Sequence, residues 1–242
     1  MNPRPTSKRW KLRGTAAGSL LVCTAQLIWL LDANRVTAAE SPRTRATIAR
    51  GPGVQCKKPD SSRMYIYKDA NSSSNNGEWA NWMPDASASS MMRLNLESDE
   101  SPLDGGTCVA VEVNFEKTDR HWCGIAVGCR NCWGLQPPET CYDLRRARAL
   151  VFWARGDAGG ERIQVKVAIT GDRPFGDSLK EPVASEWYTL TKSWAMYQLP
   201  LPGENMQRVI IPFVFVTARE RNEHRAFTFF LDEIYVDVGG VP

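Results

Sequence analysis

The sequence predicts an all-β protein, an antiparallel β-sandwich that is preceded by an N-terminal signal peptide or anchor helix. Short segments in which apolar residues alternate with polar ones recur along the chain, and turns rich in Gly and Pro separate them. No segment after the N-terminus has the 3.6-residue apolar periodicity of a convincing amphipathic helix. Many short strands with regular turns are typical of a β-sandwich.

The first 39 residues have the pattern of a secretory signal. A basic stretch at 4–13 precedes an apolar run at 14–31, and small residues follow at 36–39. The alternative is an uncleaved signal anchor, because the run approaches the roughly 20 residues that span a bilayer. With either reading the rest of the chain is expected outside the cytoplasm, secreted or in the cell envelope.

The next segment, 40–62, is rich in Pro, Arg, Thr, Ser and Gly and has no apolar periodicity, which predicts a flexible linker. The sandwich domain is therefore expected at 63–238. Six of the 30 Lys and Arg residues and one of the 27 Asp and Glu residues lie in 1–39, which leaves 24 basic and 26 acidic residues. A nearly neutral domain lacks the basic surface of a nucleic-acid binder, and we expect membrane contact only through an uncleaved N-terminal segment.

Alternating or continuous apolar segments predict the strands of the domain. They lie at 64–67, 92–96, 109–115, 150–154, 163–169, 194–199, 209–216 and 226–237. The segment 209–216 is apolar on both faces, as expected of a central strand between two layers. Its Pro212 requires an edge position or a bulge.

The last strand carries a carboxylate where an apolar face is expected. Phe227, Phe229 and Leu231 share one face at the strand period of two, and Asp232 shares the other face with Phe230. A carboxylate near a core must be paired, hydrogen-bonded or bound to a metal. Calcium takes oxygen ligands of this kind, and the alternative is an ion pair with an Arg.

The cysteines predict disulfides. Apart from Cys23 in the signal segment, six remain: Cys56, Cys108, Cys123, Cys129, Cys132 and Cys141. An even number in an exported chain indicates three bridges, whose connectivity the sequence does not specify. The alternative is zinc, because Cys129 and Cys132 have metal-ligand spacing and two further cysteines flank them.

Several short motifs occur in a fixed order over residues 63–238. They are Tyr67-Lys68-Asp69, Asp104-Gly105-Gly106, Trp133-Gly134, Tyr142-Asp143-Leu144, Leu150 to Gly156, Ser193-Trp194 and Phe230 to Ile234. This series resembles the galactose-binding-like jelly rolls of bacterial carbohydrate-binding modules and related secreted proteins. The resemblance implies a jelly-roll sandwich that binds a polysaccharide or oligosaccharide without catalysis.

The same resemblance implies a structural calcium ion between the first strand, a turn and the last strand. The positions that match are Asp69, the backbone near Asp104 and Gly105, and Asp232. The cysteine-rich segment 123–141 departs from the usual pattern and can reshape or cover a binding face.

The aromatic residues provide candidates for sugar contacts, because a flat indole face stacks on the apolar face of a sugar ring. Nine Trp residues are present. Trp153 and Trp194 lie within strand patterns and are expected to pack. Loops and strand ends are where a sandwich carries a binding site, and the candidates there are Trp122, Trp133, Trp187 and Tyr188.

These observations favour an exported, non-catalytic carbohydrate-binding module. One alternative is a structural or protein-interaction module of the cell envelope. Another is a glycoside hydrolase with an unrecognised acid pair. Glu97 and Asp99 begin an E-x-D-x-x-E pattern, but Pro102 takes the place of its last Glu. The HExxH and GxSxG motifs of metalloproteases and serine hydrolases are absent from the sequence.

Overall fold

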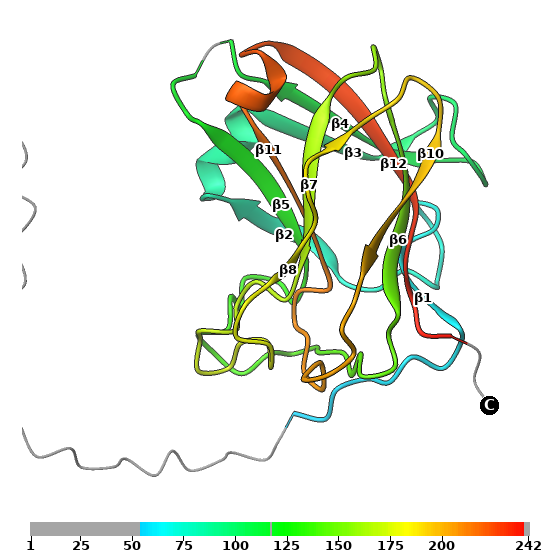
Figure 1. Ribbon diagram of the computed structural model, residues 1–242, viewed down its shortest axis with the longest axis vertical. Helices are drawn as coiled ribbons and strands as arrows, with labels where there is room; N and C mark the ends of the chain where they lie inside the picture. The colour runs from blue at the N-terminus through cyan, green and yellow to red at the C-terminus, as the bar shows by residue number, and fades with distance from the viewer. Residues whose placement is uncertain (1–53, 117, 240–242) are drawn as a thin grey trace, which may run out of the picture. The chain divides into compact units, whose positions relative to one another are not determined.

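The computed structural model describes residues 54–116 and 118–239, so the expected signal or anchor segment lies outside the described residues. The domain consists of two antiparallel six-stranded sheets (Figure 1). The strands are β1 (Arg63–Tyr67), β2 (Glu78–Met83), β3 (Met92–Ser98), β4 (Cys108–Asn114), β5 (Trp122–Gly128), β6 (Ala149–Gly156), β7 (Arg162–Val167), β8 (Val183–Ala184), β9 (Tyr188–Thr189), β10 (Ala195–Pro200), β11 (Phe213–Ala218) and β12 (Ala226–Asp237). The predicted antiparallel β-sandwich is confirmed.

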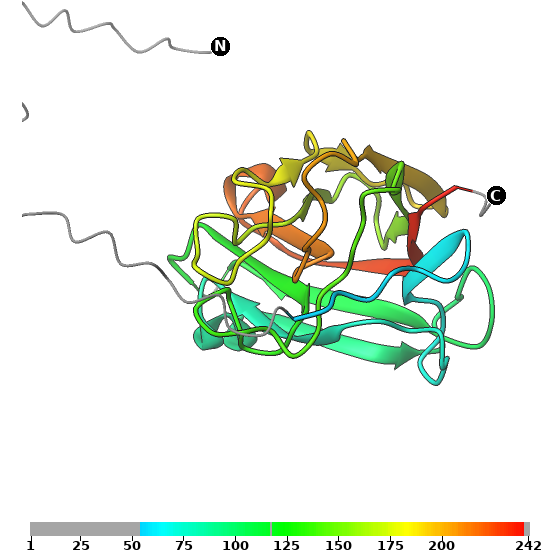
Figure 2. The ribbon, with the colours of Figure 1, turned by 90° about the horizontal axis from the view of Figure 1, so that it is seen from below.

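The first sheet has the strand order β10-β6-β12-β4-β3, and β1 also pairs with β12. The second sheet has the order β2-β5-β11-β7-β8, and β9 also pairs with β7. In Figure 2, β12 (red) lies between the blue-green strands and the gold-brown β10. The blue-green strands come much earlier in the sequence than β12. Two short 3₁₀ helices, η1 (Ala86–Ser90) and η2 (Glu220–Asn222), connect strands. Within the described part of the chain, no helix has the length and hydropathy that crossing a bilayer requires.

Strands β2 and β5 were not predicted. The apolar core of β5 is short and is flanked by Cys and Gly, so it resembled part of the cysteine-rich segment. In the structure β5 is a central strand that pairs with both β2 and β11. The irregular segment therefore begins only after Gly128. In β2 a register shift between Trp79 and Asn81 interrupts the alternation that would have revealed the strand.

Strand β11 confirms the prediction of a central strand that is apolar on both faces. It begins at Phe213, directly after Pro212, and lies between β5 and β7. Phe213 and Phe215 face the main core between the sheets. Val214 and Val216 face the other way, into an outer cluster with Met83, Ala126, Cys129, Cys132, Cys141, Ile210 and Ile211.

A bulge in β12 changes which residues face the core. Phe229 and Leu231 point inward as predicted, but the pairing with β6 shifts register between Asp232 and Tyr235. Glu233 adopts a left-handed backbone with φ of 45°, which a non-glycine residue rarely does. After the bulge Ile234 faces the core. Asp232 already faces away from the core by the strand alternation, and the extra residue keeps Glu233 out of the core as well.

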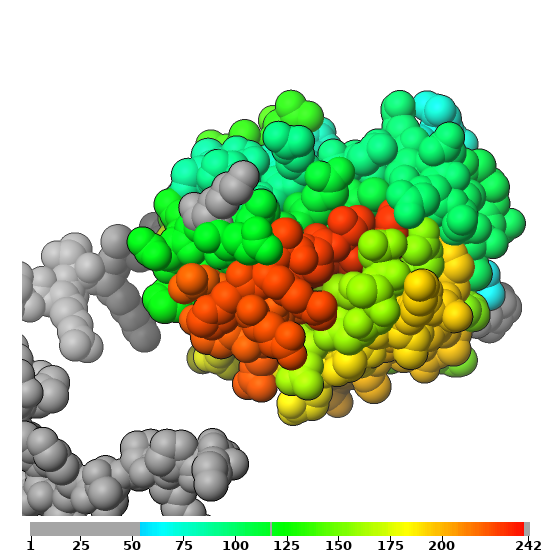
Figure 3. Space-filling view, turned by 90° about the horizontal axis from the view of Figure 1, so that it is seen from above, coloured from blue at the N-terminus to red at the C-terminus, as the bar shows by residue number. Residues whose placement is uncertain are grey.

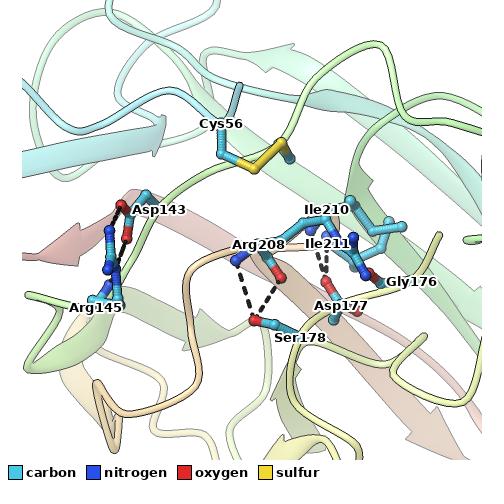
Figure 4. Close-up of a disulfide and its surroundings, with 10 residues drawn as sticks. Cys56, Asp143, Arg145, Gly176, Asp177, Ser178, Arg208, Ile210 and Ile211 are labelled. Carbon is cyan, nitrogen blue, oxygen red and sulfur yellow. Dashed lines mark hydrogen bonds and ion pairs between the residues drawn. A yellow bond between two sulfur atoms is a disulfide. The ribbon is translucent and has the colours of Figure 1, made fainter. Parts of the chain in front are cut away.

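A disulfide joins Cys56 to Cys141 (Figure 4). Next to it, the Lys57 N–H donates to the Cys141 carbonyl at 2.9 Å, and the Asp143 N–H donates to the Lys57 carbonyl at 2.9 Å. The end of the segment expected to be a linker is therefore attached to the domain.

The expectation of three bridges is wrong in this structure, where Cys108, Cys123, Cys129 and Cys132 are buried free thiols. Cys108 lies in β4 of the first sheet and Cys123 in β5 of the second. The zinc alternative also fails, because Cys141 is in the disulfide and Cys123 belongs to the main core rather than to the outer cluster.

The unreduced protein should therefore contain free thiols. Burial raises the pKa of Cys108 to about 11 and that of Cys123 to about 12, so both stay protonated and unreactive at neutral pH. Alkylation in denaturant without reductant, followed by peptide mapping, should find both residues modified and Cys56 linked to Cys141. A bridge that involves Cys108 or Cys123 would contradict the structure.

A buried carboxylate holds the entry to β11. Asp177, which is 3% exposed, accepts hydrogen bonds from the Ile210 N–H at 2.7 Å and the Ile211 N–H at 3.4 Å (Figure 4). Its other oxygen accepts from the N–H and the hydroxyl of Thr170, each at 2.8 Å. The 170–177 loop is thereby fixed to the segment before β11, which positions one end of the outer cluster.

Candidate functional site: an aromatic groove on the second sheet

A groove of about 510 Å³ lies over the outward-facing side chains of the second sheet. Its floor is apolar and comes from β2 and β11 through Met83, Val214, Val216 and Ala218. Gly124 lies between Met83 and Val216 in the register of β5. A side chain at Gly124 would collide with the carbonyl oxygen of Phe215, so this position requires glycine.

Two of the predicted binding residues, Trp122 and Trp187, line this groove. Trp122 begins β5, pairs with Ala218 and is 39% exposed. Trp187 immediately precedes β9, which pairs with β7. Three strand spacings separate β5 from β9, or about 14 Å across the sheet. Trp122 and Trp187 thus come from non-adjacent strands, with β11 and β7 between them.

Polar groups lie at the margins of the groove. The exposed His121 Nδ1 lies 2.7 Å from Glu220 Oε1, and both residues line the groove near Trp122. Gln164 donates from Nε2 to the Ser185 carbonyl at 2.8 Å. Lys166 projects from β7 into the same groove. These groups can contact hydroxyls or charges on a ligand that stacks on the indoles.

The other two aromatic candidates lie elsewhere. Tyr188 follows Trp187 directly, so it faces the opposite side of the strand, where its ring lies 5.7 Å from that of Phe152 and its hydroxyl donates to the Gln198 carbonyl at 2.7 Å. Trp133 packs half-buried against the outer cluster and does not line the groove. The structure therefore brings together two of the four candidates.

The proposed calcium ligands converge on one loop between β3 and β4. Asp232 accepts from the Leu103 N–H at 2.8 Å and more weakly from the Asp104 N–H at 3.4 Å. Asp69 accepts from the Gly106 N–H at 3.2 Å and from the Thr107 hydroxyl. The strands β1 and β12 are thus both fastened to this loop.

Gly105 lies close to the Asp69 carboxylate. A Cβ at Gly105 would lie 2.7 Å from Asp69 Oδ2. The two carboxylates differ in pKa. Hydrogen bonds, chiefly from Thr107, lower the pKa of Asp69, whereas burial raises the pKa of Asp232 to about 6 despite its N–H donors. In the described residues no Lys, Arg or His forms an ion pair with Asp232. Among the described residues the hydrogen-bond partners of this buried carboxylate are N–H groups, so the structure gives no support to the Arg alternative there.

A larger furrow of about 730 Å³ lies at one end of the sandwich. Figure 3 shows this end, with the beginning of β12 (red) between the β4–β5 connection (green) and the β6–β7 hairpin (yellow-green). Polar side chains such as Arg93, Glu112 and Asp157 line it. Its one aromatic lining residue, Phe227, is only 9% exposed and belongs to the core. The furrow therefore offers no stacking face, and the smaller groove is the better candidate.

Sequence reasoning missed the polar residues of the groove, among them Lys166, His121 and Glu220. The alternation in β7 places Gln164 and Lys166 on the outward face, so their direction was readable. Their neighbours across the sheet could not be predicted from local sequence, because the pairing of β7 with β11 joins segments that are distant in the chain.

No protein-family model matches the sequence, and no curated protein matches it. Similar solved structures include a family 30 carbohydrate-binding module, with 15% identity, a TM-score of 0.47 and coverage of 74% of this chain and 89% of that one. The family 30 module of a cellulosomal cellulase of Clostridium thermocellum has 15% identity, a TM-score of 0.44 and coverage of 72% and 96%. A family 29 carbohydrate-binding module has 11% identity, a TM-score of 0.43 and coverage of 74% and 94%.

The antiparallel two-sheet sandwich that the resemblance implies is present in the strand pairing of this chain. At this identity and TM-score the similarity assigns no ligand. Function has to be argued from the site residues of this chain.

Proposed function

We propose that this chain is an exported, non-catalytic module that binds a polysaccharide or oligosaccharide in the groove of the second sheet. The observation that carries the proposal is that Trp122 and Trp187, far apart in sequence, line one groove with an apolar floor. Two indoles and several polar groups around an apolar floor suit a chain of sugar rings, which have apolar faces and polar edges.

A hydrolytic role has less support from the groove. A glycosidase uses two carboxyl groups on either side of the scissile bond. Among the residues that line the groove, Glu220 is the only carboxylate, and it is paired with His121. Hydrogen bonding to His121 lowers the pKa of Glu220, which makes it a poor proton donor at neutral pH.

Two features support export. The basic and apolar pattern of residues 1–39 is that of a secretory signal. The Cys56–Cys141 disulfide is of the kind that persists in an oxidising compartment.

A glycan array tests the proposal, followed by product analysis of each ligand after prolonged incubation with the protein. We expect binding to at least one glycan and no turnover. Cleavage of a bound glycan would favour the hydrolase alternative. Absence of binding to every glycan would favour a structural or protein-interaction module of the envelope.

We also propose that a structural calcium ion binds at the β3–β4 loop. Asp69 and Asp232 would hold it together with carbonyl oxygens near Asp104 and Gly105, a set of hard oxygen donors that suits calcium. The raised pKa of Asp232 supports this proposal, because a nearby cation would stabilise the buried carboxylate. When bound, the ion would join β1 and β12 through the loop.

Removal of calcium should therefore lower the melting temperature. An ion that binds only the folded state stabilises it by mass action, so EDTA should lower the melting temperature and added calcium should restore it. Asp232→Asn should weaken this response. Asp104→Asn should preserve it, because Asp104 would contribute its backbone and its side chain is exposed. An unchanged melting curve in EDTA, with protein shown to be metal-free, would contradict the calcium site.

A further inference from the structure

Lys166 places an uncompensated charge in the aromatic groove. It projects from β7 between Val214 of β11 and Ala184 of β8, which are its partners across the sheet. The side chain is half-buried and lines the groove. Within residues 54–116 and 118–239, its ammonium group has no hydrogen bond or ion pair. A lysine in such surroundings has a donor that a ligand can use.

A second cation contacts Trp187. The Arg221 guanidinium lies 5.5 Å from the centroid of the Trp187 ring. Lys166 lines the same groove as Trp187, from β7, the strand that pairs with β9.

The acidic residue of the groove does not balance these charges. Glu220 is the only carboxylate among the lining residues, and its Oε1 lies 2.7 Å from His121 Nδ1. His121 and Trp122 are adjacent in sequence, so this pair lies at the Trp122 end. The carboxylate of the groove therefore has a partner of its own, whereas Lys166 has none among the described residues.

We propose that the groove selects anionic saccharides, with a carboxylate or sulfate of the glycan bound by Lys166. This inference rests on the proposed function, because it specifies the class of glycan that the groove takes. Stacking on Trp122 and Trp187 holds the sugar rings. The ammonium–anion contact discriminates between a charged and a neutral ring, and hydrogen bonds between charged groups are the stronger ones.

Calorimetric titration with matched ligands tests the inference. The ligands are an oligogalacturonate, its neutral methyl ester, a sulfated oligosaccharide and cellohexaose. We expect the acid or the sulfated glycan to bind about 10-fold more tightly than the neutral ligands, as one partly exposed charged contact provides. The preference should shrink at high salt, because exposed charges are screened.

Variants assign the preference to Lys166. Lys166→Gln should reduce it to about 2-fold or less while the affinity for the neutral ester stays unchanged. Lys192→Gln, at an exposed lysine outside the groove lining, should retain the full preference. Comparison of the affinities for the oligogalacturonate and the sulfated oligosaccharide shows whether the groove prefers a carboxylate or a sulfate group.

The possible failures are distinct. Equal affinity for the oligogalacturonate, its ester and the sulfated ligand, or a preference that survives Lys166→Gln, would overturn selection by this residue and leave carbohydrate binding intact. Failure of all four ligands and of every glycan on the array would overturn the proposed function, and the inference with it.

Discussion

Replacing Phe229 with Ala should lower the free energy of unfolding by about 3–5 kcal/mol, the usual cost of removing a fully buried aromatic ring. Phe229 is 0% exposed, and its ring lies 5.3 Å from that of Phe215 in a T-shaped contact that joins the two sheets. The ring of Phe227 lies 6.3 Å away on the same strand. Urea unfolding followed by Trp fluorescence measures the change.

Phe175 provides the control, because it is 36% exposed and lies in a loop. Phe175→Ala should cost less than about 1 kcal/mol, as expected of a surface substitution away from the core. Equal costs for the two substitutions would contradict the inward direction of Phe229, and with it the register of β12.

Asp177→Asn should lower the free energy of unfolding by about 2–3 kcal/mol. Each carboxylate oxygen of Asp177 accepts from backbone N–H groups, of Thr170 on one side and of Ile210 and Ile211 on the other. An amide supplies one acceptor oxygen, so its NH₂ group must face a backbone donor. A buried donor without an acceptor costs about 1–3 kcal/mol. Asp172→Asn in the same loop should cost under about 0.5 kcal/mol, because that carboxylate is exposed and its ion pair with Arg173 is on the surface.

The same carboxyl group should give a pH dependence. Burial outweighs the hydrogen bonds and raises the pKa of Asp177 above its ordinary value of 3.8. Above that value the native state binds more protons than the unfolded state, so the free energy of unfolding should fall as the pH rises from about 4 through the native pKa. Asp177→Asn removes the titrating group and should flatten this part of the profile. A wild-type profile that rises there, or the same slope in the variant, would contradict the raised pKa.

The faces of β12 were predictable up to Leu231, because the strand period of two depends only on local sequence. The bulge at Asp232 and Glu233 was not predictable in this way. It arises from the pairing with β6, where Asp232 is opposite Trp153 and Tyr235 is opposite Val151. Strand β5 was missed for a related reason, because its Gly and Cys residues are local signals of turns and bridges.

The site was predictable in part. Positions at strand ends favoured Trp122 and Trp187, and these two do share a groove. Tyr188 illustrates what local sequence cannot give, because the same strand end presents Trp187 to the groove and Tyr188 to Phe152. The convergence of Asp69 and Asp232 on one loop came from the family resemblance, and the structure places both there. Whether a side chain such as Lys166 has a partner depends on strands that are distant in sequence.

The most direct measurement is the affinity of single Trp variants for a glycan identified on the array. Trp122→Ala and Trp187→Ala should each weaken binding at least about 10-fold, as expected of aromatic residues that contact a ligand directly. The melting temperature of Trp122→Ala should stay close to that of the wild type, since this side chain is exposed. Trp153→Ala provides the matched control, because Trp153 is a half-buried Trp on the first sheet. Its affinity should equal that of the wild type. Unchanged affinity in both groove variants, or an equal loss in Trp153→Ala, would contradict the assignment of the binding site to this groove.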